Sequence, residues 1–403
     1  MLRILTYIVM VITSFYLFYF MVMAVGIFKK KKEKVLVDKK NNFAVIIAAR
    51  NEEAVIANLV KSLKKQNYPK DHYEIYVIVN NCTDNTEEEA RKAGAKVIMC
   101  TEKVKSKGEV LKFTFNKLKK EKDIDAYVIF DADNLVHKDF LNKMNDSLNM
   151  GYSVVQGFRD TKNISDNWLS CSYAIMYYIQ NLFLNESRYN LGKSSFINGT
   201  GFVIKKELID KYGYNPKTVT EDIEFVAMCA INGEKIAFNN EAITYDEQVN
   251  KFIPSLKQRK RWSIGTMECL RGYFSELIKT GFKNRRFECF DIIIFYLSIV
   301  IHVIGNFAPI FAILGLFINF KKLTTAYIIS TFAISLCSYV IGVVLRALLL
   351  KKYNKSVKDN IGGILFFDIF LLSWAPVNFV CLFLKKCNWE SIKHDRNIDI
   401  EEV

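Results

Sequence analysis

A pair of carboxylates directly follows a short apolar run in the first half of the chain. Asp131 and Asp133 flank Ala132, after the run at residues 127–130. Two carboxylates at this spacing, where a strand enters a loop, can both approach a divalent cation and its diphosphate. Hard oxygen ligands suit Mg²⁺ or Mn²⁺, which commonly binds through one or two carboxylates together with substrate phosphates. A solvated acidic turn is the alternative, and the position after a buried strand favours the cation site.

A second acidic element, Thr220-Glu221-Asp222, lies much further along the chain. A carboxylate separate from the metal pair can act as a general base and take the proton from an attacking hydroxyl group. Acidic residues are also common in the first turn of a helix, where they complement the helix dipole. Taken alone, this element favours the helix start.

Three polar or basic segments could bind a nucleotide. The segment 80–86 follows an apolar run, and its small side chains can hydrogen-bond a base or ribose or cap the next helix. Lys107-Gly108 precedes a predicted helix, so a cation and a helix N-terminus could face phosphate. In the segment 258–262, Arg can pair bidentately with phosphate, and Trp262 can stack on a sugar or lie at the membrane interface.

The elements that must position these residues alternate between short β-branched runs and amphipathic segments. Strands are predicted at residues 43–49, 73–80, 96–100 and 126–130, with helices at 52–66 and 85–93. This alternation predicts an α/β domain with a largely parallel sheet. Ligands bind such sheets at the carboxyl ends of the strands, which is where the polar segments lie.

Long apolar runs lie at the two ends of the chain. Residues 4–28 can span a bilayer as a retained anchor, and three further regions follow at 289–320, 326–350 and 361–384. The region 252–279 is basic and aromatic, as in helices that lie in the membrane interface. We expect two true spans among the three later regions, with the last region the weakest, because lysines after residue 384 favour a cytoplasmic C-terminus.

The formal net charge of +14 raises the question of nucleic-acid binding. Lysines cluster beside the apolar runs, at residues 29–34 and 385–386, where they favour the cytoplasmic side and anionic lipid. Outside the membrane-proximal region no basic face is interleaved with aromatic residues. We therefore expect no nucleic-acid partner.

The order of the motifs resembles one family. Residues 48–53, 80–86, 107–108, 131–133, 198–201, 220–222 and 258–262 follow one another as in family 2 glycosyltransferases of the GT-A fold. The resemblance covers residues 43–265 and is to the membrane-embedded cellulose, chitin, hyaluronan and poly-N-acetylglucosamine synthases. It implies a Rossmann-like, mostly parallel cytosolic domain between N-terminal and C-terminal transmembrane helices.

The resemblance also implies roles for individual residues, with Asp222 as the catalytic base. The nucleotide sugar would be bound by Ala48, Arg50, Glu52, Asn80, Lys107, Asp131 and Asp133, the last two also holding Mg²⁺ or Mn²⁺. The acceptor would contact Asn198, Gly199, Thr200 and Trp262, and the diphosphate would contact Gln258, Arg259 and Arg261. Many relatives have Asp where this chain has Asn80, whose carbonyl can still accept from a uracil imide, so uridine is expected as the base.

The predicted protein is therefore a multi-pass membrane enzyme with a cytoplasmic catalytic domain. We expect an inverting transfer from a UDP-sugar to a growing polysaccharide or oligosaccharide, processive and coupled to translocation. Single-step transfer to a lipid-linked acceptor is the alternative, and a nucleotide-sensing transporter or receptor without catalysis is a more distant one. The predicted parts are an anchor (1–28), the GT-A domain (42–250), interfacial helices (251–286), the C-terminal membrane region (287–385) and a cytosolic tail (386–403).

Overall fold

The computed structural model describes residues 2–31, 36–306, 325–384 and 396–402. One eight-stranded sheet has the order β3-β2-β1-β4-β7-β6-β8-β5. The strands are β1 (Phe43–Ala49), β2 (Tyr73–Val79), β3 (Lys96–Met99), β4 (Ala126–Asp131), β5 (Leu135–Val136), β6 (Val154–Thr161), β7 (Phe202–Lys205) and β8 (Ile236–Asp246). The four predicted strands are β1 to β4, and each ends within one residue of its predicted end.

The pairing of the strands brings the motifs to one edge of the sheet. β1 lies between β2 and β4, parallel to both, while β7 runs antiparallel to β4 and β6. Ala48 is paired with Asp131, and the neighbouring Ala49 is paired with Val79, which precedes Asn80. The mostly parallel sheet predicted from the sequence is thus confirmed, and its carboxyl edge collects the polar loops.

Helices cover both faces of the sheet, because each face carries its own apolar cluster. One face packs against α2 (Ile56–Lys64), α3 (Thr86–Ala93) and α5 (Phe140–Asn149). The other packs against α4 (Lys107–Leu118), α8 (Lys206–Tyr212) and α9 (Glu221–Asn232). These strands are buried on both sides, which explains their nearly continuous runs of Ile, Val and Ala.

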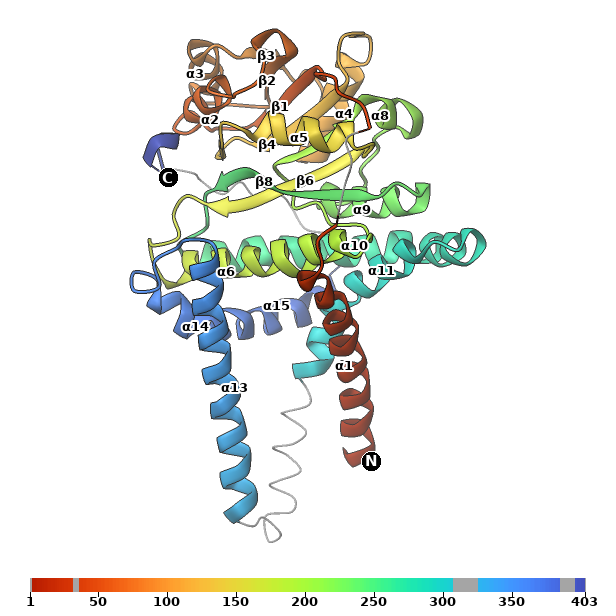
Figure 1. Cartoon of the computed structure of the whole chain (residues 1–403), viewed down its shortest axis with the longest axis vertical. Helices are drawn as coiled ribbons and strands as arrows, with labels where there is room; N and C mark the ends of the chain where they lie inside the picture. The colour runs from red at the N-terminus through yellow and green to blue at the C-terminus, as the bar shows by residue number, and fades with distance from the viewer. Residues whose placement is uncertain (1, 32–35, 307–324, 385–395, 403) are drawn as a thin grey trace.

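A platform of two helices, α6 (Trp168–Ile179) and α10 (Phe252–Asn284), lies beneath the sheet (Figure 1). The basic and aromatic region predicted as interfacial helices forms most of α10, a single helix of 33 residues. The short helices α14 (Ile361–Leu372) and α15 (Trp374–Cys381) contact the platform from below. In Figure 1 they run across the molecule, whereas α1 (Leu2–Ala24) and α13 (Thr325–Lys352) run away from it.

Among the described residues, three helical segments are long and apolar enough to cross a membrane: Tyr7–Phe28, Ile329–Lys352 and Ile361–Cys381. The first part of the predicted region 289–320 forms α11 (Phe287–Tyr296) and the helix Ser298–Asn306, with a bend of 41° between them. Residues 307–320 of that prediction lie outside the described residues. α1 is fixed to the catalytic domain where Ser187 donates to the Met23 carbonyl and Asn190 donates to the Gly26 carbonyl.

Candidate active site

One cavity of about 890 Å³ joins the carboxyl edge of the sheet to the platform and the apolar helices below it. Most of the predicted site residues line it: Ala48, Arg50, Glu52, Asn80, Lys107, Asp131, Asp133, Asn198, Gly199, Asp222, Gln258, Arg261 and Trp262. The structure therefore brings together residues that are more than two hundred positions apart in the sequence. Thr200 and Arg259 are the predicted site residues that do not line it.

The first turn of α4 holds the acidic motif in place. Ser106 caps this helix by accepting from the Glu109 N–H. Lys107 donates to Asp131 Oδ1 at 2.5 Å and to the Gly199 carbonyl at 2.7 Å. Burial alone would lower the pKa of Lys107, but the charges of Asp131 and Glu221 outweigh it and raise the pKa. The lysine therefore stays charged and links the acidic motif to the loop before β7.

The acidic motif fits a divalent cation that shares its ligands with substrate. Asp131 and Asp133 line the cavity, and Asp133 is only 4% exposed. Asp246 and Glu247, at the end of β8, add negative charge to the same wall. Among the described residues, no group of three or more His, Cys, Asp or Glu side chains forms a complete metal site. Mg²⁺ usually binds through one or two carboxylates, and oxygen atoms of phosphate and water complete its coordination shell.

Asn80 presents a hydrogen-bond acceptor at the end of the cavity next to β2. It follows β2, lines the cavity and is 7% exposed, and its Oδ1 atom is buried without a hydrogen-bond partner. A buried acceptor without a partner costs roughly 1–3 kcal/mol, so it is normally satisfied by a ligand or water. The loop around it is held to the loop after β1, because Thr83 N–H donates to Asn51 Oδ1 at 2.8 Å and Glu52 N–H donates to Thr86 Oγ1 at 2.8 Å.

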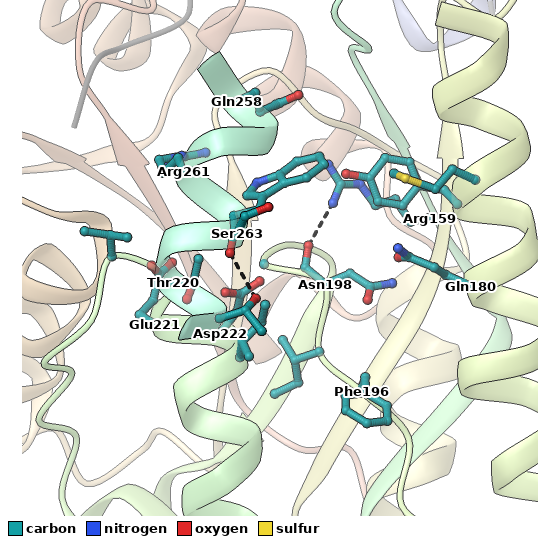
Figure 2. Close-up of a pocket in the computed structure, with 18 of the residues that line it drawn as sticks. Arg159, Gln180, Phe196, Asn198, Thr220, Glu221, Asp222, Gln258, Arg261 and Ser263 are labelled. Carbon is teal, nitrogen blue, oxygen red and sulfur yellow. Dashed lines mark hydrogen bonds between the residues drawn. The ribbon is translucent and has the colours of Figure 1, made fainter. Parts of the chain in front are cut away.

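Asp222 stands at the start of α9, opposite the loop that carries Gly199. Its Oδ2 lies 3.1 Å from the position that a Cβ on Gly199 would take, so only glycine leaves the carboxylate its space there. Burial raises the pKa of both Asp222 and Glu221, and the charge of Asp222 raises that of Glu221 further. Figure 2 shows the two carboxylates below Arg261 and Gln258 of α10. Raised pKa values in a cavity are typical of proton-transfer groups.

A buried glutamate, Glu224, holds the turn before Asp222 in place. No pattern in the sequence pointed to this residue. Glu224 is 1% exposed and accepts from the backbone N–H groups of Lys217 and Thr218. The Tyr273 hydroxyl donates to the same carboxylate at 2.5 Å, which ties the turn to α10. Glu224 thus fixes where the first turn of α9 begins.

One face of α10 forms the wall opposite Asp222. Gln258, Arg261 and Trp262 line the cavity. Further along the same face, Gly265 lies so close to Thr220 that an added Cβ would stand 2.3 Å from its Oγ1. These positions follow the spacing i, i+3, i+4 and i+7 and therefore share one side of a helix.

Two predicted roles need correction. Arg259 is fully buried on another side of α10, where it donates to the Phe370 carbonyl and Ser373 Oγ, both at 2.9 Å. It joins α10 to α14 and does not reach the diphosphate. Thr200 is also fully buried, and its Oγ1 accepts from the Asp131 N–H at 3.0 Å. It supports the acidic motif from behind and does not contact the acceptor.

A buried ion pair between two strands was missed by sequence reasoning. Arg159 of β6 forms a two-nitrogen pair with Asp246 of β8 and donates to the Asn198 carbonyl at 2.8 Å. Burial raises the pKa of Asp246 to about 6, although Arg159 opposes the shift. The signal in the sequence was a charged residue at the end of each strand, but the sequence did not show that β6 and β8 are neighbours.

The cavity continues from Asp222 into the apolar helices. Its lower walls come from α1, α11 and the helix Ser298–Asn306, with the lining residues Thr13, Tyr16, Leu17, Phe295, Ser298, Ile299, Ile301, His302 and Gly305. A polar chain crosses its floor: Trp374 donates to Ser263 Oγ at 3.0 Å, Ser263 donates to Asn378 Oδ1 at 2.6 Å, and the Asn378 amide meets His302 Nδ1 at 2.8 Å.

Comparisons with known proteins agree with this architecture. Residues 41–265 match the family model described as glycosyltransferase like family 2. The Probable glycosyltransferase YdaM of Bacillus subtilis is 25% identical over 260 residues, covering 60% of this chain and 59% of the relative. A beta-monoglucosyldiacylglycerol synthase of Nostoc sp. is 25% identical over 265 residues, covering 62% and 54%. The chain thus spans less than two thirds of the length of these relatives.

A solved structure shares the fold over nearly the whole chain. The mannosyltransferase of Pyrobaculum calidifontis, determined in complex with GDP-Man and Mn²⁺, gives a TM-score of 0.61 at 15% sequence identity. The similarity covers 94% of this chain and 99% of that protein. At this level of identity the similarity shows the fold, which is the GT-A architecture expected from the motifs.

Proposed function

The chain belongs to glycosyltransferase family 2, and on this premise we propose that it transfers a sugar from a uridine nucleotide sugar to an acceptor hydroxyl, with inversion at the anomeric carbon. The observation that carries the proposal is the single cavity that joins Asn80, the acidic motif and Asp222. Donor, base and acceptor can therefore occupy one continuous cavity.

The nucleotide end of the cavity supports a uracil base. Asn80 Oδ1 has no hydrogen-bond partner and can accept from the imide N–H of the base. Lys107 is positioned to hold the diphosphate beside Asp131, and Arg261 and Gln258 approach from α10. A Mg²⁺ or Mn²⁺ bound by Asp131 and Asp133 would neutralise the charge that develops on the leaving diphosphate. The similar mannosyltransferase was determined in complex with GDP-Man and Mn²⁺, so its metal is consistent with this assignment, whereas its nucleotide carries guanine.

In the transfer step, Asp222 is the general base. The acceptor hydroxyl gives its proton to the Asp222 carboxylate while its oxygen forms a bond to the anomeric carbon. The bond from that carbon to the diphosphate breaks on the opposite side, and UDP leaves. Burial raises the pKa of Asp222 and so makes its carboxylate a stronger base. Gly199 leaves room beside the carboxylate for the incoming hydroxyl.

The protein is membrane-associated, and we propose that its catalytic domain faces the cytoplasm. In the sequence, the lysines at residues 29–34 lie between α1 and the catalytic domain, and lysines beside a membrane span favour its cytoplasmic side. This orientation would place the site for the proposed nucleotide-sugar donors in the cytoplasm. Two classes of acceptor satisfy the chemistry above, a growing carbohydrate chain and a lipid.

The proposal is tested with the full-length protein in detergent and a panel of UDP-sugars, with GDP-mannose as a comparison. We expect release of UDP together with a glycosylated product. Asp222→Asn is expected to bind UDP like the parent but to lose roughly two to four orders of magnitude in rate, the usual contribution of a general base. Asp210→Asn, which changes an exposed aspartate on α8, serves as the matched control. Weakened UDP binding with preserved turnover in Asp222→Asn would contradict the assigned role.

A further inference from the structure

The cavity has two ends of different character. Its basic lining residues are Arg50, Lys105, Lys107, Arg159 and Arg261. All of them come from the catalytic domain or from the catalytic face of α10, and Arg159 is already paired with Asp246. At the membrane end, the described lining residues from α1, α11 and the helix Ser298–Asn306 include no lysine or arginine. An anionic group placed at that end would lose its water without gaining a cation.

The polar chain on the cavity floor fixes the protonation of His302. Ser263 receives a hydrogen bond from the Trp374 indole, so its own hydroxyl donates to Asn378 Oδ1. The Asn378 amide therefore points its NH₂ group at His302 Nδ1, which must accept. The imidazole is then neutral and carries its proton on Nε2. It offers the cavity a hydrogen-bond donor without a charge.

The membrane end of the cavity also reaches the outside of the helices. Leu17 of α1 lines the cavity and is 67% exposed, so the space opens beside this helix. The neighbouring wall is the helix Ser298–Asn306, where a Cβ on Gly305 would stand 3.5 Å from Thr13 Cγ2. Tyr7–Phe28, which contains most of α1, is long and apolar enough to span a membrane, and Ser298–Asn306 reaches that length and composition together with α11, with a bend of 41° between the two helices. The opening is therefore at the level of lipid.

We propose that the acceptor is a membrane lipid with an uncharged, hydroxyl-bearing head, such as a diacylglycerol, which enters from the bilayer between α1 and the helix Ser298–Asn306. This inference rests on the proposed function. The head passes His302 and Asn378 to place its hydroxyl at Asp222, while the acyl chains stay among the apolar lining residues. The glycosylated lipid leaves by the same route, so each turnover adds one sugar to one lipid.

The same features disfavour the other acceptors. A lipid phosphate would have to pass its charge through the membrane end of the cavity, whose described lining residues include no lysine or arginine. A growing carbohydrate chain would lay its hydroxyl groups against Leu17, Phe295 and Ile299, which cannot hydrogen-bond them. These features favour single-step transfer, the alternative that the sequence left open for a lipid-linked acceptor, over processive polysaccharide synthesis.

The experiment uses the full chain in phosphatidylcholine nanodiscs with a labelled UDP-sugar. Three acceptors are compared: dioleoylglycerol, undecaprenyl phosphate and a soluble oligosaccharide. We expect a lipid-extractable product with the mass of dioleoylglycerol plus one sugar. A product on the lipid phosphate, or a polymer, would overturn the lipid assignment while leaving the proposed function intact. Absence of nucleotide release with every donor and acceptor would refute the proposed function instead.

A binding measurement decides the lipid assignment even without turnover. A diacylglycerol bearing a photoreactive diazirine is cross-linked in the nanodisc, and labelled peptides are identified by mass spectrometry. We expect labels in α1 and the helix Ser298–Asn306 that excess dioleoylglycerol removes. Labels confined to other surfaces, or labels that dioleoylglycerol does not remove, would overturn the proposed entry route.

A variant pair tests the passage itself. Gly305→Leu adds a branched side chain to the cavity wall beside Thr13, and we expect the KM for dioleoylglycerol to rise about tenfold or more because the side chain narrows the passage. Gly272→Leu is the control, because a Cβ at Gly272 of α10 meets nothing within 4 Å. UDP affinity, measured by calorimetry, reports that each variant is folded. An unchanged acceptor KM in folded Gly305→Leu would contradict the route.

Discussion

Substitution of Gly265 by alanine should damage catalysis without weakening nucleotide binding. A Cβ at Gly265 would stand 2.3 Å from Thr220 Oγ1 and 2.4 Å from its Cγ2, whereas ordinary contact begins at 3.4 Å. Thr220 must therefore retreat by about 1 Å, and Asp222, two residues further on, moves with it. A misplacement of about 1 Å at a reacting group can cost roughly 100-fold in rate. We expect that loss in kcat, with the UDP affinity unchanged because Asn80 and Lys107 lie on other elements.

The control for this prediction is Gly272→Ala in the same helix. Both glycines lie inside α10, so both substitutions favour the helix by about 1 kcal/mol. Only Gly265 faces a neighbour, since nothing lies within 4 Å of a Cβ at Gly272. Steady-state kinetics and thermal unfolding of both variants separate the two effects. A parental kcat in Gly265→Ala would refute the reasoning, and a raised donor KM alone would show that α10 had moved in place of Thr220.

Three further predictions concern the metal, the pH profile and the orientation. Asp133→Asn should abolish transfer at limiting Mg²⁺ or Mn²⁺ in a folded protein, and near-parental turnover there would contradict the metal assignment. Asp222 must be ionised to act as the base, and burial raises its pKa. We therefore expect kcat/KM to fall as the pH drops through this pKa, at a higher pH than for an ordinary aspartate. A single cysteine at Asn397, in an otherwise cysteine-free variant, should resist an impermeant reagent added outside intact cells, and labelling would place the C-terminus outside.

The sheet was predictable wherever local sequence determined it. The runs at 43–49 and 126–130 became β1 and β4 because strands buried on both faces need unbroken apolar side chains. The short β7, with only four residues, gave no such signal. It is stabilised by antiparallel pairing with β4 and β6, which lie far from it in the sequence. Pairing of this kind is a tertiary property that no local pattern reports.

The site was predictable where its residues follow strands, and less so where they lie on a helix. Asn80, Asp131 and Asp133 were found because the ends of parallel strands meet at one edge. On α10, the basic segment was visible in the sequence, but its orientation was not. At about 100° per residue, Arg261 and Trp262 point within about 60° of Gln258, whereas Arg259 points about 100° away from it. Helical spacing could have excluded Arg259 once Gln258 and Trp262 were chosen, and the packing against α14 accounts for its charge.

The number of membrane crossings follows from contacts at the end of the chain. Lys65 of α2 pairs with Asp399 at 3.2 Å and with Glu401 at 2.8 Å, so the C-terminal residues lie on the catalytic domain. By length and composition, Ile361–Cys381 could be a span, which would carry these residues to the opposite side. In the structure this segment forms α14 and α15, which contact the platform and run across the direction of α13 (Figure 1).

If α14 and α15 lie along the membrane surface, the end of α13 is already on the side of the membrane that holds the catalytic domain. The tail can then reach α2 without another crossing. Asp368 of α14 supports this arrangement, because it pairs with Arg346 of α13 at 3.0 Å and its side chain is 48% exposed, which suits an aqueous interface better than hydrocarbon. An even number of crossings after the catalytic domain, as expected from the lysines that flank the last apolar region, therefore agrees with the contacts of the tail.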